Sequence, residues 1–569
     1  MKVTDYIIEF LIEKGITDIF GYPGGVICHL MDSATKYPQI KAHTNYHEQG
    51  AAFAACGYAQ SSGKLGVAYS TSGPGATNLV TGIANAYYDS IPTLFLTGQV
   101  DTYAEKGDYP VRQRGFQETD VVSITQSITK YAVRVDDVNQ IKYCLEKAYA
   151  IAFEGNPGPV LLDLPADVQR AEVDLDTLES YKEVEKDNNN NNKAIDELIG
   201  LIQNAKRPAF LVGNGVKICG CIPSLSRILN VVNIPSVFSL PAFDVLPNNH
   251  PLNYGFIGTN GHRYANFVLG KSDLIISIGS RLDIRQIGLA REKFAPEAKL
   301  VRIDIDEESL RYKVHDDEVQ IVADLRVFLP ALQTALMSTK MPSFSEWIKV
   351  CDTFKKELTG FDDKYWNEMV AKLSERVRDN INITLDVGQN QLWFAQSFKV
   401  KEKQTVYMSA GHGSMGYSLP AAIGICYGSE KPVLCVNGDG GLMMNVQELQ
   451  FIKRENLPIV VLCINNYALG MIRGFQERNF NCNYINTTNN SGYLSTDFKK
   501  LAEAFGFTYC QYSTVEELQS ADFSFTEPAF VEVSLNMDTV LVPNFGRNGL
   551  IQDQMPYIDR DLFDKLMGL

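Results

Sequence analysis

The chain has 569 residues, which is too long for one hydrophobic core and indicates three or four domains. Its net charge of -15, with no basic block, argues against a nucleic-acid partner, and its 45% hydrophobic content is that of an ordinary globular protein. No stretch of about 18 uncharged apolar residues occurs, and the first 15 residues carry acidic side chains at helical spacing, unlike a signal peptide. We therefore expect no nucleic acid and no membrane among its partners, and a cytoplasmic location.

The first segment, residues 1–175, alternates helical and strand patterns and is predicted to be an α/β domain. A strand ends at the glycine-rich loop 21–25, whose backbone can approach a ligand closely. Glu48 then precedes a run of alanines and glycines that predicts a tightly packed helix. A carboxylate there either stabilises the helix N-terminus or takes part in chemistry, and the residues alone leave both interpretations open.

Residues 64–98 show the order strand, Gly-rich turn, helix, strand, and the same order returns at 432–466. This repetition indicates two domains of similar fold at the two ends of the chain. Between them, residues 176–193 are polar and of low complexity and predict a linker. Residues 194–340 then predict a further α/β domain, whose Gly213-Asn-Gly215 turn is by itself only a weak indication of nucleotide binding.

The last segment, residues 365–569, contains the most informative stretch, 432–466, which predicts a βαβ unit. The turn Gly438-Asp439-Gly440 should lie at the carboxyl edge of the sheet, where glycines let backbone N–H groups approach a phosphate. Asp439, Asn466 and the backbone carbonyl of Ala468 would offer the oxygen ligands that Mg²⁺ accepts. A GDG turn alone is more often structural, but a following strand that ends in Asn465-Asn466 favours a metal site.

This GDG-helix-NN pattern, with NLP before the second strand and LGMIRGFQ after it, resembles that of thiamine diphosphate enzymes and closely that of the acetolactate synthase (acetohydroxyacid synthase) large-subunit family. The resemblance extends over nearly the whole chain. It implies an α/β fold of three doubly wound parallel-sheet domains. These are a pyrimidine-binding domain (1–175), a central flavin-type domain (194–340) and a diphosphate- and Mg²⁺-binding domain (365–569).

The resemblance also implies catalytic roles. The segment HEQGA matches the family's activating glutamate, so Glu48 is expected to share a proton with the aminopyrimidine ring of thiamine diphosphate. Met415 matches an apolar wedge that folds the two rings of the cofactor together; without the match it would be a core gap-filler. Gln117 and Lys130 match positions where an amide and an ammonium would orient a 2-oxo acid; without the match both would be solvated surface residues.

Two cofactor-binding sets follow from the same resemblance. The diphosphate set contains Gly388, Gln389, Asn390, Gly413, Gly438 and Gly440, with Asn390 where the family has histidine. The set expected to contact FAD contains Gly213, Gly215, Gly279, Arg281, Asp283, Arg285, Asp304 and Asp324. The flavin takes no electrons in the family's main reaction. This chain lacks the family's histidine in GTNG and its third glycine in GNG.

The implied reaction is decarboxylation of pyruvate and carboligation to a second carbonyl, with 2-acetolactate as the expected product for branched-chain amino acid biosynthesis. The implied assembly is a homodimer or homotetramer with sites shared between chains, and a regulatory small subunit is a further possible partner. Two alternatives stay open. One is a different acceptor, such as a keto-sugar nucleotide or a ketone, and the other is a 2-oxo acid oxidase or decarboxylase on the same scaffold.

Three further expectations concern the acceptor pocket and the C-terminal tail. Tyr109 stands where the family has arginine, and Phe475 where the synthases that favour 2-oxobutyrate have tryptophan. We therefore expect a wider pocket that distinguishes acceptors less sharply. The C-terminal tail, FGRNGLIQDQMPYIDRDLF, is expected to fold over the site and to exclude water.

Overall fold

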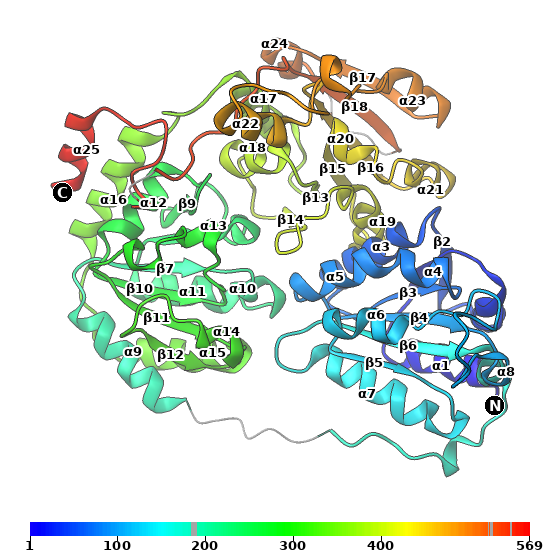
Figure 1. The fold of residues 1–569 in the computed structure, drawn as a ribbon. Helices are drawn as coiled ribbons and strands as arrows, with labels where there is room; N and C mark the ends of the chain where they lie inside the picture. Colours follow the sequence, from blue (N-terminus) through cyan, green and yellow to red (C-terminus); the bar gives the residue numbers. More distant parts are fainter. Residues whose placement is uncertain (184–190, 522, 524–526, 547–548) are drawn as a thin grey trace.

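Three six-stranded sheets, with all strands parallel, organise the chain (Figure 1). The structure is a computed structural model that describes residues 1–183, 191–521, 523, 527–546 and 549–569. Helices flank each sheet, so the prediction of three doubly wound α/β domains is confirmed. Among the described residues, none of the helices combines the length and the apolar character needed to cross a bilayer.

The N-terminal sheet has the strand order β2-β1-β3-β4-β6-β5. Its strands are β1 (Asp18–Gly21), β2 (Lys41–Thr44), β3 (Gly66–Ser70), β4 (Thr93–Gln99), β5 (Tyr131–Arg134) and β6 (Pro159–Pro165). Its helices are α1 (Val3–Glu13), α2 (Cys28–Ala34), α3 (Glu48–Ser62), α4 (Pro74–Asn78), α5 (Val80–Tyr88), α6 (Val121–Thr125), α7 (Ile141–Phe153) and α8 (Ala166–Arg170). Strands β3, β4 and β6 are buried along their whole length, because helices cover both faces of a parallel sheet.

The C-terminal sheet repeats this order as β14-β13-β15-β16-β18-β17. Its strands are β13 (Asn382–Leu385), β14 (Thr405–Met408), β15 (Val433–Gly438), β16 (Ile459–Asn465), β17 (Thr508–Tyr512) and β18 (Ala529–Ser534). The helices of this part are α17 (Tyr365–Arg376), α18 (Gln389–Ser397), α19 (Ser418–Ser429), α20 (Asp439–Leu442), α21 (Glu448–Arg454), α22 (Gly470–Asn479), α23 (Phe498–Ala504), α24 (Val515–Gln519) and α25 (Arg560–Met567). The order changes direction between β13 and β15, which is where ligands bind in open α/β sheets.

The central sheet has a different order, β12-β11-β10-β7-β8-β9, that changes direction between β7 and β10. Its strands are β7 (Pro208–Val212), β8 (Ser236–Phe238), β9 (Asn253–Phe256), β10 (Leu274–Ile278), β11 (Lys299–Asp304) and β12 (Val319–Val322). Its helices are α9 (Asn192–Asn204), α10 (Gly215–Ile218), α11 (Ile222–Val232), α12 (Arg263–Lys271), α13 (Ile284–Ile287), α14 (Glu307–Arg311), α15 (Leu325–Met337) and α16 (Ser345–Leu358). Part of the predicted linker, residues 184–190, lies outside the described residues, and the domain limits stay a prediction.

The C-terminal domain packs against both other domains. Alternate residues of a strand face opposite sides of the sheet. Cys435 and Val461 accordingly join the core of the N-terminal domain, whereas Val436 and Leu462 join a core shared with the central domain. Helix α19 lies very close to α3. A Cβ on Gly57 of α3 would lie 2.2 Å from the carbonyl oxygen of Ala421 in α19. The glycines and alanines of α3 therefore permit this close contact between the domains.

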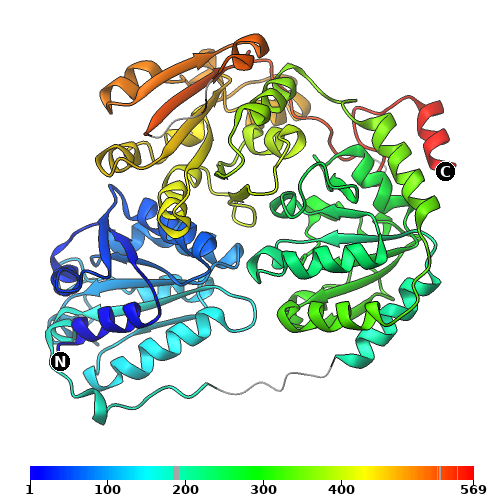
Figure 2. The same cartoon turned by 180° about the vertical axis from the view of Figure 1, so that it is seen from behind.

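The C-terminal tail crosses to the central domain, and the two views agree that α25 lies beside α16 (Figure 1, Figure 2). Ile551 and Leu566 are buried in the core of the central domain. Arg263 donates hydrogen bonds to the carbonyl oxygens of Gln554 (2.9 Å) and Pro556 (2.7 Å). The apolar residues of the tail therefore complete the core of the central domain, and its expected place over the catalytic site stays a prediction. Residues 547 and 548 of the predicted tail lie outside the described residues.

Candidate active site

The predicted metal ligands follow two neighbouring strands of the C-terminal sheet. Asp439 comes directly after β15 and Asn466 directly after β16, and these strands pair in parallel up to Gly438. Asp439 is 2% exposed and Asn466 is 6% exposed. Parallel strands end at one edge of the sheet, so the two polar side chains meet in a buried place that has to satisfy their oxygens.

Three polar groups converge there. The side-chain amide of Asn466 lies 2.9 Å from the carbonyl oxygen of Ala468 and 3.3 Å from Asp439 Oδ1. With its nitrogen towards these oxygens the amide donates to both and satisfies them without a metal. With its oxygen towards them it completes a set of three oxygens, the kind of ligand that Mg²⁺ accepts. The donor set therefore fits Mg²⁺.

Neighbouring residues fix the three ligands. Tyr467 adopts a φ of +56°, a left-handed conformation that is uncommon for a non-glycine residue, in the turn that joins Asn466 to Ala468. The hydroxyl of Tyr493 donates to Asp439 Oδ2 at 2.9 Å. Burial raises the pKa of Asp439 to about 6, although this hydrogen bond opposes the shift.

The predicted diphosphate residues lie at the same edge, where the strand order changes direction. A Cβ on Gly438 would lie 3.2 Å from Asn390 Oδ1, so the turns after β13 and β15 touch. Asn390 Nδ2 donates to the carbonyl oxygen of Asp386 at 2.8 Å, which fixes the start of α18. Gln389 lies 3.0 Å from the amide of Asn466, which joins this loop to the metal ligands.

The third part of this edge is the segment before α19. Gly413 has a φ of +69°, and a Cβ there would face open space. Gly440 has the half-buried Met415 beside it: Met415 Cε lies 3.6 Å from the place of a Cβ on Gly440. The structure thus gathers Gly388, Gln389, Asn390, Gly413, Met415, Gly438 and Gly440 along one edge of the C-terminal sheet.

Glu48 lies in the N-terminal domain, at the first position of α3. Asn78 Nδ2 donates to its Oε2 at 2.9 Å, and a Cβ on Gly75 would lie 3.2 Å from its Oε1. A glycine is therefore needed at position 75 for the carboxylate to fit. Gln117 lies on the other side of the same loop, with its Cβ 2.9 Å from the place of a Cβ on Gly73.

Lys130 is placed elsewhere. Its ammonium donates to the carbonyl oxygen of Glu154, in the loop after α7. Its side chain also lies against Gly158, where a Cβ would meet it at 3.0 Å. These contacts attach Lys130 to the loop between α7 and β6 of the N-terminal domain.

One buried carboxyl joins the N-terminal and C-terminal domains. Glu448, in α21, is 0% exposed and accepts hydrogen bonds from Asn45 Nδ2 (2.9 Å) and from the backbone N–H of Tyr46 (3.0 Å). Burial raises the pKa of Glu448 to about 7, although these donors oppose the shift. A Cβ on Gly50 would lie 2.5 Å from its Oε1. Glu448 therefore attaches the helix beyond the metal motif to the segment that leads into Glu48.

A cavity of about 640 Å³ lies where the three domains meet. All but one of the residues predicted to contact FAD line it: Gly215, Gly279, Arg281, Asp283, Arg285, Asp304 and Asp324. The exception, Gly213, lies against the turn after β10, where a Cβ would come within 2.0 Å of the Gly279 carbonyl oxygen. These two turns mark the change of strand direction between β7 and β10, the position at which such a sheet binds a dinucleotide.

The other two domains also line this cavity. The N-terminal domain contributes residues 88–92, and the C-terminal domain contributes residues 405–408 and Gly411. Asp89 accepts the backbone N–H of Gly411 at 2.6 Å, which holds the two domains together at the rim. The size and the position of the cavity fit a dinucleotide such as FAD.

Comparison with known protein families finds three matches in chain order. Residues 1–124 match the N-terminal TPP binding domain of thiamine pyrophosphate enzymes, residues 195–332 their central domain and residues 386–533 their C-terminal TPP binding domain. The chain is 34% identical to the acetolactate synthase isozyme 2 large subunit of Escherichia coli over 92% of each protein. This chain belongs to the acetolactate synthase large-subunit family. The family assignment and the prediction of an enzyme that uses thiamine diphosphate are confirmed.

Other members of the acetolactate synthase family are equally similar. A probable acetolactate synthase large subunit of Methanocaldococcus jannaschii is 36% identical over the whole of this chain and 98% of the relative. The chloroplastic acetolactate synthase 2 of Zea mays is 34% identical over 97% of this chain and 88% of the relative. The similarity thus extends over all three domains.

Several residues of the site were not predicted from the sequence. Tyr493 and Thr539 contact the metal ligands from segments far along the chain, with Thr539 Oγ1 2.9 Å from the Asn466 amide. Asn78 and Glu448 were missed as well. The spacing GPGATN could have indicated Asn78, because it places an amide one helical turn beyond the glycine turn. The other three carry no local signal, since only the packing of distant segments brings them to the site.

Proposed function

We propose that this chain is a thiamine diphosphate- and Mg²⁺-dependent acetolactate synthase, which decarboxylates pyruvate and joins the resulting two-carbon unit to a second pyruvate. The observation that carries the proposal is the meeting of the Asp439 carboxylate, the Asn466 amide and the Ala468 carbonyl beside glycine turns at the edge of the C-terminal sheet. The names of the relatives, all acetolactate synthases, support the reaction.

In this proposal the C-terminal domain holds the diphosphate end of the cofactor. Asp439, Asn466 and the Ala468 carbonyl hold Mg²⁺, whose remaining positions go to phosphate oxygens and water. The turns at Gly388 and Gly438 leave room for phosphate oxygens, because side chains there would approach Asn390. Asn390 is neutral and donates its N–H to Asp386, so charge neutralisation rests on the metal.

The N-terminal domain holds the aminopyrimidine end. When bound, thiamine diphosphate supplies a thiazolium carbon that accepts the electron pair released as the 2-oxo acid loses CO₂. Glu48 holds and returns the proton of the pyrimidine ring nitrogen, and Asn78 keeps its carboxylate in place. Gln117 orients the 2-oxo acid from the other side of the 71–75 loop. Lys130, which the family resemblance places near the substrate, is proposed to help hold the 2-oxo acid; in this chain it also contacts the 154–158 loop.

The central cavity is proposed to hold FAD in a structural role. Arg281 and Arg285 would meet its phosphates, and Asp304 at the end of β11 would accept from a ribose hydroxyl. Burial raises the pKa of Asp304, which suits a side chain that exchanges hydrogen bonds with a neutral sugar. Flavin released by denaturing the purified protein and measured by its absorbance tests this part of the proposal.

The site is proposed to be shared between chains in a homodimer or homotetramer, with a regulatory small subunit as a further partner. Large apolar side chains are exposed in both domains: Phe116 beside Gln117, Met444 in the turn after α20, and Ile472 and Phe475 on α22. Water-exposed aromatic and aliphatic side chains of this kind favour a covering partner. Sedimentation of the purified protein with and without cofactors tests the assembly.

Product analysis decides between the proposed function and its alternatives. The protein is incubated with pyruvate, thiamine diphosphate and Mg²⁺, and the products are identified by mass spectrometry, alone and with a ketone or a keto-sugar nucleotide present. We expect 2-acetolactate and one CO₂ for each acetolactate formed. Acetaldehyde alone would indicate a decarboxylase, acetate or acetyl phosphate with peroxide would indicate an oxidase, and a ligation product formed only with an added acceptor would indicate a different carboligase.

A further inference from the structure

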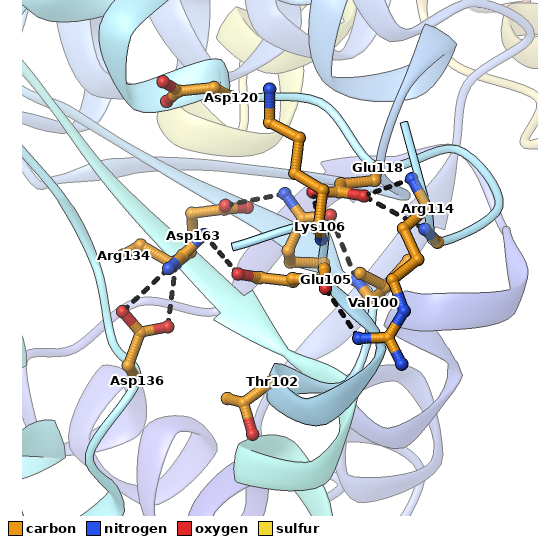
Figure 3. Close-up of polar contacts among 12 residues, drawn as sticks. Val100, Thr102, Glu105, Lys106, Arg114, Glu118, Asp120, Arg134, Asp136 and Asp163 are labelled. Atoms are coloured by element: carbon orange, nitrogen blue, oxygen red, sulfur yellow. Dashed lines mark hydrogen bonds and ion pairs between the residues drawn. The ribbon is translucent and has the colours of Figure 1, made fainter. Parts of the chain in front are cut away.

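The loop between β4 and α6, residues 100–120, carries Gln117 and is folded around one carboxylate. Figure 3 shows the polar contacts within this loop and beneath it. Its chain leaves the carboxyl end of β4 and returns to the start of α6, so both of its ends are attached to the N-terminal sheet. The residues between form no strand and no α-helix, so side-chain contacts have to define the conformation of the loop.

Glu118 supplies three of these contacts, and the Arg114 guanidinium adds hydrogen bonds to the carbonyl oxygens of Tyr103 and Glu105, each at 3.0 Å. Its Oε1 accepts the backbone N–H of Lys106 at 2.9 Å, and its Oε2 accepts the backbone N–H groups of Arg114 and Gly115, each at 3.0 Å. A single carboxylate thus joins three points of the loop that are up to twelve positions away in the sequence. Desolvation alone would raise the pKa of Glu118, but these three donors lower it, so the group is ionised at neutral pH. Both oxygens are used within the protein.

A second contact set attaches the end of the loop to the sheet. Gln99 Nε2 donates to the carbonyl oxygen of Thr119 (2.8 Å) and to Asp163 Oδ2 (3.1 Å). Arg134 lies between Asp136 and Glu105, and its guanidinium is 2.6 Å from Glu105 Oε2 (Figure 3). Thr119, after Gln117, and Glu105, before it, are therefore both attached to residues of the N-terminal sheet. These contacts restrict the conformations open to Gln117.

The backbone of Gln117 shows what this arrangement achieves. Its φ is +64°, in the left-handed region that costs a non-glycine residue on the order of 1 kcal/mol. In this conformation its carbonyl oxygen and Cβ both lie 2.9 Å from the place of a Cβ on Gly73. Gly75, in the same turn, lies against Glu48. Gln117 is thus held in an unfavourable conformation that brings it to the loop beside the catalytic carboxylate.

We propose that Glu118 is a positioning residue: by accepting the backbone N–H groups of Lys106, Arg114 and Gly115, it fixes the 100–120 loop and holds Gln117 beside the turn that contacts Glu48. Glu118 acts through Gln117 and does not touch substrate. This inference rests on the proposed function, in which Gln117 orients the 2-oxo acid.

The first test is a double-mutant cycle on pyruvate kinetics. Glu118→Gln keeps the size of the side chain but replaces one acceptor oxygen by an N–H donor, which faces backbone N–H groups. We expect Glu118→Gln and Gln117→Ala each to raise KM for pyruvate about tenfold, with kcat changed less than about threefold. The double variant should be no worse than Gln117→Ala, because Glu118 acts only through that residue. Losses that multiply in the double variant would overturn the proposal.

Lys106→Ala is the matched control. It removes a charged side chain next to Glu118 but keeps the backbone N–H that Glu118 accepts. We expect its KM for pyruvate to stay within about twofold of the unmodified protein. A tenfold rise in KM for Lys106→Ala, with none for Glu118→Gln, would show that side-chain charge and not the backbone contacts holds the loop.

Hydrogen exchange provides a measurement that does not depend on turnover. In the unmodified protein the amides of Lys106, Arg114 and Gly115 should exchange at least tenfold more slowly than the exposed amides between them. Glu118→Gln should remove this protection, and Lys106→Ala should keep it. Absence of protection in the unmodified protein would overturn the inference even if Glu118→Gln does not fold. A protein that does not turn over pyruvate would instead refute the proposed function, while the exchange result would still decide the role of Glu118.

Discussion

The two outer domains share one strand order but differ in the turn after their third strand. In the N-terminal domain β3 leads into the 71–75 turn, which forms a cradle for the carboxylate of Glu48. In the C-terminal domain β15 leads into the 438–441 turn, which itself supplies the carboxylate of Asp439. The common topology thus decides where along the sheet a ligand can bind, and the residues of the turn decide which chemistry it meets.

The largest expected effect is the loss of turnover on substitution of Glu48 in the N-terminal domain. Glu48→Gln should lower kcat by about 10²- to 10⁴-fold, because proton transfer to and from the cofactor ring is lost. Thiamine diphosphate affinity should stay within about tenfold, since the diphosphate and metal contacts lie in the other domain. Steady-state kinetics and calorimetric titration of the cofactor check both values. Glu13→Gln, an exposed carboxyl on α1, is the control; normal turnover of the Glu48 variant would contradict the assignment.

The next largest expected effect is the loss of cofactor affinity on substitution of Asp439 in the C-terminal domain. Asp439→Ala should weaken Mg²⁺ and thiamine diphosphate binding together, by roughly 10- to 100-fold, because one metal ligand is lost and buried oxygens of Asn466 and Ala468 are left unpaired. The measurement is cofactor titration at several Mg²⁺ concentrations. Asp538→Ala removes an exposed carboxylate from a nearby segment and should change neither affinity. Unchanged cofactor affinity in the Asp439 variant would place the metal elsewhere.

A smaller expected effect concerns the choice between the two acceptor substrates, 2-oxobutyrate and pyruvate. Phe475 is 50% exposed on α22, the helix after the metal motif, and contacts Phe480 edge to face. We expect the unmodified protein to favour 2-oxobutyrate over pyruvate as acceptor by less than about tenfold, and Phe475→Trp to raise that preference, because a pocket wall distinguishes one methylene by about 1 to 3 kcal/mol. A competition assay with both acids measures the ratio. Phe480→Trp is the control, and an equal rise in both variants would exclude position 475 as the pocket wall.

The smallest expected effect concerns the contact that Glu448 makes between the C-terminal and N-terminal domains. The pKa of Glu448 is about 7 in the folded protein, above the ordinary value for glutamate, because the carboxyl is buried. A raised pKa in the folded state means that its contribution to stability is complete at low pH and is lost as the pH rises through 7. Glu448→Gln resembles the protonated form. The variant should match the unmodified protein at pH 5 and unfold a few degrees higher at pH 8.

Thermal unfolding of both proteins from pH 5 to pH 8 checks this sign. Glu455→Gln, a partly exposed neighbour whose pKa is lowered by Lys41 and Arg454 although desolvation opposes this, is the control and should not raise the unfolding temperature at pH 8. A Glu448 variant that is less stable than the unmodified protein at pH 8 would show that the ionised carboxylate stabilises the interface.

The sequence predicted the fold well where each signal is local. Apolar runs and glycine turns were sufficient for the strands β1, β3, β4, β15 and β16, and the alanine-rich run predicted α3. The meeting of Asp439 and Asn466 at one edge of the sheet was predictable for the same reason, since both directly follow strands, whereas their binding of Mg²⁺ stays a prediction. The position of the C-terminal tail was not predictable, because its apolar residues could pack against any incomplete core. Only the three-dimensional packing shows that they belong to the core of the central domain. Tyr493, Thr539 and Glu448 were missed because their roles depend on contacts between segments distant in the sequence.

The two faces of the C-terminal sheet have a consequence for how the protein loses its structure. The buried apolar residues of one face belong to a core shared with the N-terminal domain, and those of the other face to a core shared with the central domain. Opening this sheet would disrupt both shared cores at once, whereas each neighbouring domain shares only one of them. Three domains that are separate in sequence are therefore expected to melt together in one calorimetric transition, with the C-terminal sheet as the element that makes unfolding cooperative.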